Sequence, residues 1–518
     1  MITGVHGLIF TSDAEGVRAF FRDVLGFPSL DTGDGWLIFR LPPAELGVHP
    51  DEGDGRHQLS LLCDDVHATV ADLEGKGVEF TGPITDEGWG LETWIRLPGV
   101  SCRCTSRSIR ARWTAELDGG RDGRARSRLN VASTFVSHVT LFDGRNVSEA
   151  RSILIEDARI AWVGPHARAP REALAAAEVE GRGRTLIPGL IDAHVHLAWD
   201  GTSDMAAETN GLTDERAVGK AARNLRRHLA AGVTTVRDLG GPSAVICDVA
   251  RTVSRGSRVV AAGRALTAPG GHGRGMFAVE VSGPDQIRGA VRDQVAAGAA
   301  AIKLVATGGV VTPGIGVDFT AFSQDELDAA VDEAHLLGVG VAAHAHGAEG
   351  IERAIRAGVD SVEHGSQISD VVAEEMKRRG TFHVGTISPG RVMLDHADEI
   401  PDYAAAKSRE IAPAREASFR LTARLGVKHA TGTDAGTPFN VHGALPRELA
   451  FMVEWGMAPF DVMRAATAHG AELLRLPDVG SIEPGTRADL VLYDGNPCED
   501  IAITANPEVV WAGGVAAR

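Results

Sequence analysis

Two histidines separated by one residue stand at the end of an apolar run, in His194-Val195-His196. The run, residues 186–197, contains a Pro-Gly turn signal and then has the pattern of a short buried strand. Because side chains alternate along a strand, both imidazoles face the same side. Such a pair can bind one divalent cation, and imidazole suits Zn²⁺. A lone His-x-His is weak evidence, so the rest of the chain must supply further ligands.

Further ligand types follow at the ends of later strand-like runs. Across residues 189–479, strand-like and helical segments alternate in about eight units, which is the size and rhythm of a (β/α)8 barrel. Chemistry in such barrels is located where the strands end. The residues at these ends are His194, His196, Arg237, Asp238, Lys303, His344, His364 and Asp434.

Lys303 is the unusual residue in this series, because it lies inside the apolar run Ala301-Ile302-Lys303-Leu304-Val305. Burial disfavours the charged form of a lysine side chain. A neutral buried amine can react with CO₂ to give a carbamate, and a carbamate can bridge two metal ions. The position of Lys303 therefore favours a site with two ions.

The composition is that of an ordinary globular protein, with 44% hydrophobic and 23% charged residues. At 518 residues the chain is too long for a single core. A net charge of −17 argues against a nucleic acid or an anionic membrane as the main partner. We see no secretory signal or membrane-spanning run, and five scattered cysteines fit a reducing compartment. We therefore expect a cytoplasmic protein.

The first hundred residues alternate short strands with one helix per half, at about residues 14–24 and 66–76. The segments Phe20-Phe21-Arg22-Asp23-Val24-Leu25-Gly26-Phe27 and Gly77-Val78-Glu79-Phe80 resemble the vicinal-oxygen-chelate (glyoxalase/bleomycin-resistance) family. That resemblance implies an α+β module built from βαβββ repeats over residues 1–100. Residues 100–104 do not look like a strand, so we expect the last strand to be missing. The stretch 101–131 is rich in arginine, and we interpret it as a linker.

Strand-like runs also occur on both sides of the barrel region, in residues 132–188 and 480–518. Strand-rich flanks around a long α/β region predict one small β-sandwich domain built from both ends of this part of the chain. The expected fold is therefore of the α/β class, a TIM barrel with a β-sandwich and an N-terminal α+β module.

Six motifs together make the barrel region recognisable, and they begin with Pro188-Gly189-Leu190-Ile191-Asp192-Ala193-His194-Val195-His196. The others are Lys303-Leu304-Val305-Ala306-Thr307-Gly308-Gly309, His344-Ala345-His346-Gly347, Val362-Glu363-His364-Gly365, Gly432-Thr433-Asp434 and Gly485-Thr486-Arg487-Ala488-Asp489-Leu490. From about residue 139 onward the chain resembles the amidohydrolase superfamily. The resemblance is to its imidazolonepropionase-like branch, which includes prolidase-type and ochratoxin-type amidases.

The resemblance implies a binuclear metal site, with Zn²⁺ as the expected ion. His194, His196 and Asp434 would hold the more buried ion, and His344 and His364 the more exposed one. Carboxylated Lys303 would bridge both ions. A hydroxide shared by the ions would be the nucleophile, and Asp434 would move its proton to the leaving amine.

Three further residues are candidates for contacts with the substrate. His346 lies two residues after His344 and resembles the family's substrate-side histidine. The alternative is that His346 supports a metal ligand from behind and does not contact the substrate. His272, in a glycine-rich loop, is a candidate for substrate contact. Arg237 either forms an ion pair with Asp238 or binds the substrate carboxylate.

The leading hypothesis is a binuclear amidohydrolase that cleaves an N-acyl amino acid or an Xaa-amino-acid dipeptide. One alternative is mononuclear hydrolysis of a cyclic amide, as in imidazolonepropionase, against which Lys303 argues. Another is a small-ligand binding or resistance protein that acts through the N-terminal module. Removing residues 1–131 would discriminate the last case. We expect a small-molecule substrate and a homo-oligomer.

Overall fold

A computed structural model describes residues 133–252 and 256–517, together with short segments of the N-terminal part. Contacts divide the chain into two units, Met1–Arg126 and Ser127–Arg518, which are described separately. Among the described residues, no helix is both long and apolar enough to cross a membrane.

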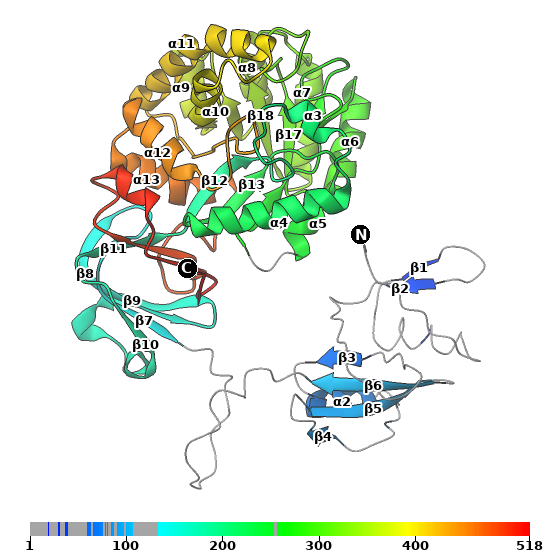
Figure 1. Cartoon of the computed structure of the whole chain (residues 1–518), viewed down its shortest axis with the longest axis vertical. Helices are drawn as coiled ribbons and strands as arrows, with labels where there is room; N and C mark the ends of the chain where they lie inside the picture. Colours follow the sequence, from blue (N-terminus) through cyan, green and yellow to red (C-terminus); the bar gives the residue numbers. More distant parts are fainter. Residues whose placement is uncertain are drawn as a thin grey trace. The chain divides into compact units, whose positions relative to one another are not determined.

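The N-terminal unit contains one complete βαβββ succession (Figure 1). Its elements are β3 (Ser60–Cys63), α2 (Val66–Gly75), β4 (Thr85–Asp86), β5 (Leu91–Leu97) and β6 (Val100–Ser106). The sheet order is β3-β6-β5-β4, and a separate pair joins β1 (Ser29–Asp31) to β2 (Leu37–Phe39). The helix predicted for residues 14–24 lies largely outside the described residues.

The expectation that residues 100–104 do not form a strand is wrong, because β6 covers them and continues to Ser106. β6 pairs antiparallel with β5 and parallel with β3, so it has a partner on each edge. Strand formation depends more on such pairing than on the side-chain pattern, which is weak here. The N-terminal module therefore extends into the stretch that we interpreted as a linker.

The strand-rich flanks form one mixed sheet of eight strands. From the first flank come β7 (Thr134–Phe142), β8 (Val147–Glu156), β9 (Arg159–Pro165), β10 (Ala177–Glu180) and β11 (Arg184–Pro188). From the second come β21 (Leu490–Asp494), β22 (Val509–Ala512) and β23 (Val515–Ala516). β11 pairs with both β7 and β21, which joins the two flanks into one small β domain.

Eight parallel strand positions make up the barrel. They include β12 (Leu190–Val195), β13 (Val233–Asp238), β14 (Arg258–Ala261) with β15 (Ala265–Thr267), β17 (Ala301–Val305), β18 (Gly340–Ala345), β19 (Ser361–His364) and β20 (Phe382–Val384). The eighth position is residues 428–435, which bridge to β20 through His429 and to β12 through Ala435. Between β14 and β17, Ala300 N donates to Ala261 O at 2.8 Å, which connects the third strand position to the fourth. This is the predicted (β/α)8 arrangement.

Helices surround these strands, as Figure 1 shows for α4, α5, α6 and α7 around β12, β13, β17 and β18. The helices after successive strands are α4 (Asp214–Ala230), α5 (Val245–Thr252), α6 (Pro284–Ala296), α7 (Gln324–Leu336), α8 (Ala348–Ala357) and α9 (Asp370–Arg379). After β20 come α10 (Ile387–Asp395) and α11 (Asp402–Leu425).

α11 begins at Asp402 and continues through Pro413, which lies inside the helix. Proline usually occupies the first turn of a helix, since it cannot donate a backbone hydrogen bond further in. Here buried residues on both sides of Pro413, such as Ile411 and Phe419, keep the helix packed through the missing bond. Packing outweighs local propensity in this helix.

Tyr493 on β21 gives a stability test of the small β domain. Its side chain is fully buried, and its hydroxyl has no hydrogen-bond partner among the described residues. Leaving a buried hydroxyl unpaired costs about 1–3 kcal/mol, so we predict that Tyr493→Phe raises the free energy of unfolding by about 1 kcal/mol. Tyr493→Ala should lower it by about 3–5 kcal/mol by opening a cavity. Denaturant titration measures both, and a destabilising Tyr493→Phe would contradict an unpaired hydroxyl.

Candidate metal centre

The carboxyl ends of the barrel strands bring the predicted ligands to one pocket. Because all the strands are parallel, side chains at their ends meet at the same rim. The lining of this pocket includes His194, His196, Lys303, His344, His364 and Asp434, the six predicted metal ligands. It also includes His272 and His346, whereas Arg237 is not part of the lining.

The first group of potential ligands surrounds Asp434. His194 Nε2 lies 3.4 Å and His196 Nε2 lies 3.3 Å from Asp434 Oδ1. The two histidines share a face because they are separated by one residue at the end of β12. Asp434 follows the extended eighth segment in a left-handed backbone conformation, with φ of 57°. Three donors therefore converge on a small volume that suits one divalent ion.

A second group lies beside the first. Potential ligand atoms of His344, His346 and His364 lie within 4.8 Å of one another, and so do those of His194, His364 and Asp434. His364 belongs to both groups and connects them. The structure thus adds His346 to the set that could hold an ion, a role that the sequence analysis did not give it.

Lys303 lies on β17 beneath these groups and is only 2% exposed. Its Nζ has no hydrogen-bond partner among the described residues. Burial lowers the pKa of this amine to about 8, although the nearby carboxylates of Glu363 and Asp434 raise it. A neutral amine is the form that reacts with CO₂, so the site fits the expected carbamate.

Each histidine in the site has one ring nitrogen held by the protein. These contacts are His194 Nδ1 with Glu363 Oε2 at 2.8 Å, His196 Nδ1 with Gly240 O at 2.8 Å, His344 Nε2 with Gly308 O at 3.1 Å, His346 Nδ1 with Ser366 Oγ at 2.8 Å and His364 Nδ1 with Thr386 Oγ1 at 2.7 Å. Metal-binding histidines are typically held in this way through the second nitrogen. One nitrogen of each ring remains for an ion or a substrate.

Four of the five histidines have pKa values that favour the neutral form, which metal binding requires. Burial lowers the pKa of His194 to about 4, and burial holds the pKa values of His344, His346 and His364 well below their usual range. His196 differs, because the hydrogen bond and charge of Asp434 raise its pKa despite burial. Neutral imidazoles together with a carboxylate and a lysine are a donor set for Zn²⁺ or a similar ion.

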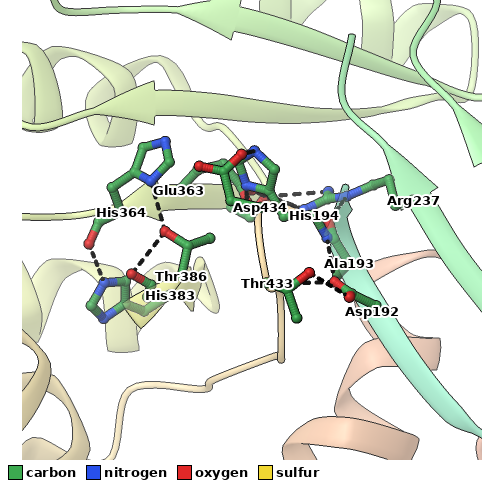
Figure 2. A network of polar contacts seen from close by, with 12 residues as sticks. Asp192, Ala193, His194, Arg237, Glu363, His364, His383, Thr386, Thr433 and Asp434 are labelled. Carbon is green, nitrogen blue, oxygen red and sulfur yellow. Dashed lines mark hydrogen bonds and ion pairs between the residues drawn. The ribbon is translucent and has the colours of Figure 1, made fainter. Parts of the chain in front are cut away.

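Arg237 and Glu363 hold His194 through a chain of polar contacts (Figure 2), and neither lines the pocket. Arg237 Nη2 donates to Glu363 Oε1 at 2.8 Å, and Arg237 Nε donates to Ala193 O at 2.7 Å. Burial alone would raise the pKa of Glu363, but the charge of Arg237 and the hydrogen bond with His194 lower it overall. Glu363 therefore stays ionised and holds the imidazole of His194.

The predicted ion pair between Arg237 and Asp238 is wrong, and Arg237 does not reach the substrate pocket. Adjacent residues of a strand point to opposite sides, so these two side chains face apart on β13. Asp238 instead accepts hydrogen bonds from Leu197 N at 2.7 Å and Gly240 N at 3.1 Å. It thereby positions the loops that follow β12 and β13.

Asp192 is a site residue that the sequence analysis missed. It accepts hydrogen bonds from Thr433 N at 2.9 Å, Thr433 Oγ1 at 2.7 Å and His194 N at 3.3 Å. These bonds tie the strand that carries His194 to the segment that carries Asp434, as Figure 2 shows. The sequence could have indicated this residue, because Asp192 is an acidic residue inside an apolar run, two positions before His194.

Comparison with known proteins identifies the family. The model of the amidohydrolase family matches residues 185–516, which is more than half of the chain. The chain belongs to the amidohydrolase family. The model of the glyoxalase/bleomycin resistance protein/dioxygenase superfamily matches residues 5–95, which confirms the resemblance of the N-terminal module.

Relatives of this amidohydrolase include ochratoxinase from Aspergillus niger, which is 32% identical over 436 residues, covering 75% of this chain and 88% of the relative. Imidazolonepropionase from Salinispora arenicola is 27% identical, over 66% of this chain and 85% of the relative. A solved Xaa-Pro dipeptidase with bound methionine is 33% identical, with a TM-score of 0.68 over 74% of this chain and 99% of that one. The chain is therefore a hydrolase that acts on carbon–nitrogen bonds.

Arg237→Met tests whether the buried pair behind His194 holds the centre of this amidohydrolase together. The change leaves Glu363 buried without its cation, so we predict a loss of about 3–5 kcal/mol in the free energy of unfolding. The control Arg258→Met breaks a half-exposed pair with Asp478 and should cost about 1 kcal/mol or less. Equal costs in chemical denaturation would contradict the account.

The same pair sets a pH dependence. The folded-state pKa of Glu363 lies below its ordinary value of 4.5, so its ionisation stabilises the fold above about pH 4.5, and this contribution is lost as the pH falls. Glu363→Gln should flatten that part of the stability profile.

Proposed function

We propose that this amidohydrolase uses two divalent metal ions, with Zn²⁺ favoured, to hydrolyse an amide bond in a small N-acyl amino acid or Xaa-amino-acid dipeptide. The observation that carries the proposal is the buried amine of Lys303, which has no partner among the described residues and lines the same pocket as the two groups of potential ligands. Similarity to an ochratoxinase and to an Xaa-Pro dipeptidase supports linear amides as the substrates.

The proposed ligands divide as the family resemblance implies. His194, His196 and Asp434 would hold one ion, and His344 and His364 the other. Lys303, as a carbamate, would contribute an oxygen to each ion. The donor set fits because burial favours the neutral form of His194, His344 and His364, a second nitrogen of each ring is held, and the amine of Lys303 has no partner among the described residues.

Asp434 would transfer the proton in the reaction. When bound, the ions supply Lewis acidity toward the scissile carbonyl and the attacking water. The Asp434 carboxylate accepts a proton from this water as the water oxygen bonds to the carbonyl carbon. It then delivers the proton to the nitrogen as the carbon–nitrogen bond breaks, so that an amine and a carboxylic acid leave.

His346 and His272 would contact the substrate. The Nδ1 of His346 is held by Ser366 Oγ, and the Nδ1 of His272 by Thr312 Oγ1 at 2.8 Å, which leaves Nε2 of each ring for the substrate. His346 Nε2 would donate a hydrogen bond to the oxygen that gains negative charge in the transition state. His272 would contact the bound substrate from the loop after β15.

The setting of the enzyme is also part of the proposal. We propose a cytoplasmic protein, which the free, buried thiols of Cys247 and Cys498 support, and we propose that it forms a homo-oligomer. In this proposal the N-terminal module takes no part in the hydrolysis. Hydrolysis by the isolated residues 127–518 would agree with this role.

Loading the full chain with Zn²⁺ in the presence of bicarbonate tests the proposed activity. We predict release of free amino acid from a panel of N-acyl amino acids and dipeptides, measured by chromatography. Removal of the metal with a chelator should abolish the release, because the neutral imidazoles and Asp434 then hold no Lewis acid. Cleavage of cyclic amides together with no cleavage of any linear substrate would contradict the proposal.

A further inference from the structure

Arg415 on α11 is a second buried cation beside the candidate metal centre. Its side chain lines the same pocket and only 5% of the residue is exposed. Among the described residues that line the pocket, Lys303 and Arg415 are the two lysine or arginine side chains. Because Lys303 serves the ions in the proposed function and Arg237 lies behind His194, Arg415 is the cation available to a substrate.

The guanidinium of Arg415 is only partly satisfied by the protein. Its Nη2 donates to Thr386 Oγ1 at 2.7 Å and also to Thr386 O, and Nε and Nη2 contact Gly385 O at 3.4 and 3.3 Å. Its Nη1 makes no hydrogen bond, and the group forms no ion pair with an Asp or Glu of the described residues. A guanidinium carries five donors, so both hydrogens of Nη1 remain available.

Gly390 on α10 gives the guanidinium of Arg415 the room in which Nη1 lies. A Cβ at this position would lie 2.6 Å from Arg415 Nη1, closer than real contacts of this kind. A glycine within a helix costs about 0.5–1 kcal/mol relative to alanine, so a physical reason for it is expected. Its helix is held in place by Glu448, which accepts hydrogen bonds from Ile387 N and Ser388 N, both at 2.7 Å.

The remaining lining of the pocket is largely apolar. It includes Met205, Phe277, Val310, Val311, Pro389 and Met393. A small ligand with one anionic group and an apolar body would match one free guanidinium edge among such residues. This is the chemistry of an amino acid with a free carboxylate and an apolar side chain.

We propose that Arg415 Nη1 binds the carboxylate of the amino acid that leaves in the reaction, and that Gly390 allows the guanidinium to lie where it makes this contact. The inference rests on the proposed function and narrows its substrate class to N-acyl amino acids with a free carboxylate and an apolar side chain. Charge-assisted hydrogen bonds from a guanidinium to a carboxylate are among the stronger polar contacts. Carboxamide-capped analogues, which lack the charge, should then be poor substrates.

Arg415 also has a structural contact that a test must separate from substrate binding. Thr386 Oγ1, which accepts from Arg415 Nη2, lies 2.7 Å from His364 Nδ1. Thr386 has a φ of 44°, which is strained for a branched residue, and Arg415 helps to hold it there. Removing Arg415 would disturb His364 and slow the reaction with every substrate. Gly390→Ala displaces the guanidinium from the Nη1 side and keeps Arg415 and Thr386 themselves, so the neutral carboxamide reports any loss that comes through Thr386.

The experiment uses the Zn²⁺-loaded full chain with N-acetyl-L-phenylalanine and its neutral carboxamide, measuring acetate release. We expect wild type to prefer the free acid by about 10–100-fold in kcat/KM, as for a hydrogen bond to a charged group. Gly390→Ala should remove most of this preference by raising KM for the acid alone. Arg415→Met should remove it and also lower kcat for both compounds. Arg420→Met, an exposed arginine of α11 paired with Glu416, should match wild type.

Two results would overturn the inference: wild type without preference for the free acid, or Gly390→Ala with the same effect on both compounds. If wild type cleaves no member of the substrate panel, the proposed function fails by itself. Calorimetric titration with N-acetyl-L-phenylalanine then still tests Arg415. Binding that Gly390→Ala weakens about 10-fold or more supports the carboxylate site, and equal or absent binding contradicts it.

Discussion

A lysine amine held inside a protein without a hydrogen bond is unfavourable in its charged form, and Lys303 is in that position. The carboxylates of Glu363 and Asp434 stabilise its charge in part, yet burial still lowers its pKa to about 8. The amine lines the same pocket as imidazoles that burial keeps neutral. The centre therefore presents several nitrogen lone pairs, with little positive charge nearby to interact with them. Such an arrangement is stabilised by bound cations and by a carbamate on the amine. The proposed metal ions and the proposed carbamate therefore follow from the same buried lysine.

The barrel holds each histidine of the centre through one ring nitrogen. His194 is held by Glu363, which in turn is held by Arg237, and His364 is held by Thr386, which contacts Arg415. The side chains that hold the histidines lie on the barrel strands and on the segments that follow them. The second nitrogen of each ring remains available at the pocket. Non-glycine residues with positive φ occur at His364, Thr386 and Asp434, which places backbone strain directly at the centre.

Much of the site could be predicted because its information is local. The spacing of His194 and His196, and the apolar run around Lys303, determine which way those side chains point within one strand. Arg237 shows the limit: its sequence neighbour Asp238 suggested an ion pair, whereas its partner Glu363 comes from a strand far along the chain. Gly390 and Arg415 carry no local signal either, since they meet only when α10 packs on α11. The strand β6 was missed for the same reason, because its pairing with β3 and β5 decides its structure.

The most direct test of the account is the zinc content of the purified full chain and of Lys303→Ala, measured by elemental analysis after loading with Zn²⁺ and bicarbonate. The exposed Lys428, which pairs with Glu472, provides a matched control as Lys428→Ala. The account predicts about two Zn²⁺ per chain in wild type and in the control, and one or fewer in Lys303→Ala, because the bridging group is lost. One Zn²⁺ per chain in all three proteins would contradict a carbamate-bridged pair and favour a mononuclear hydrolase.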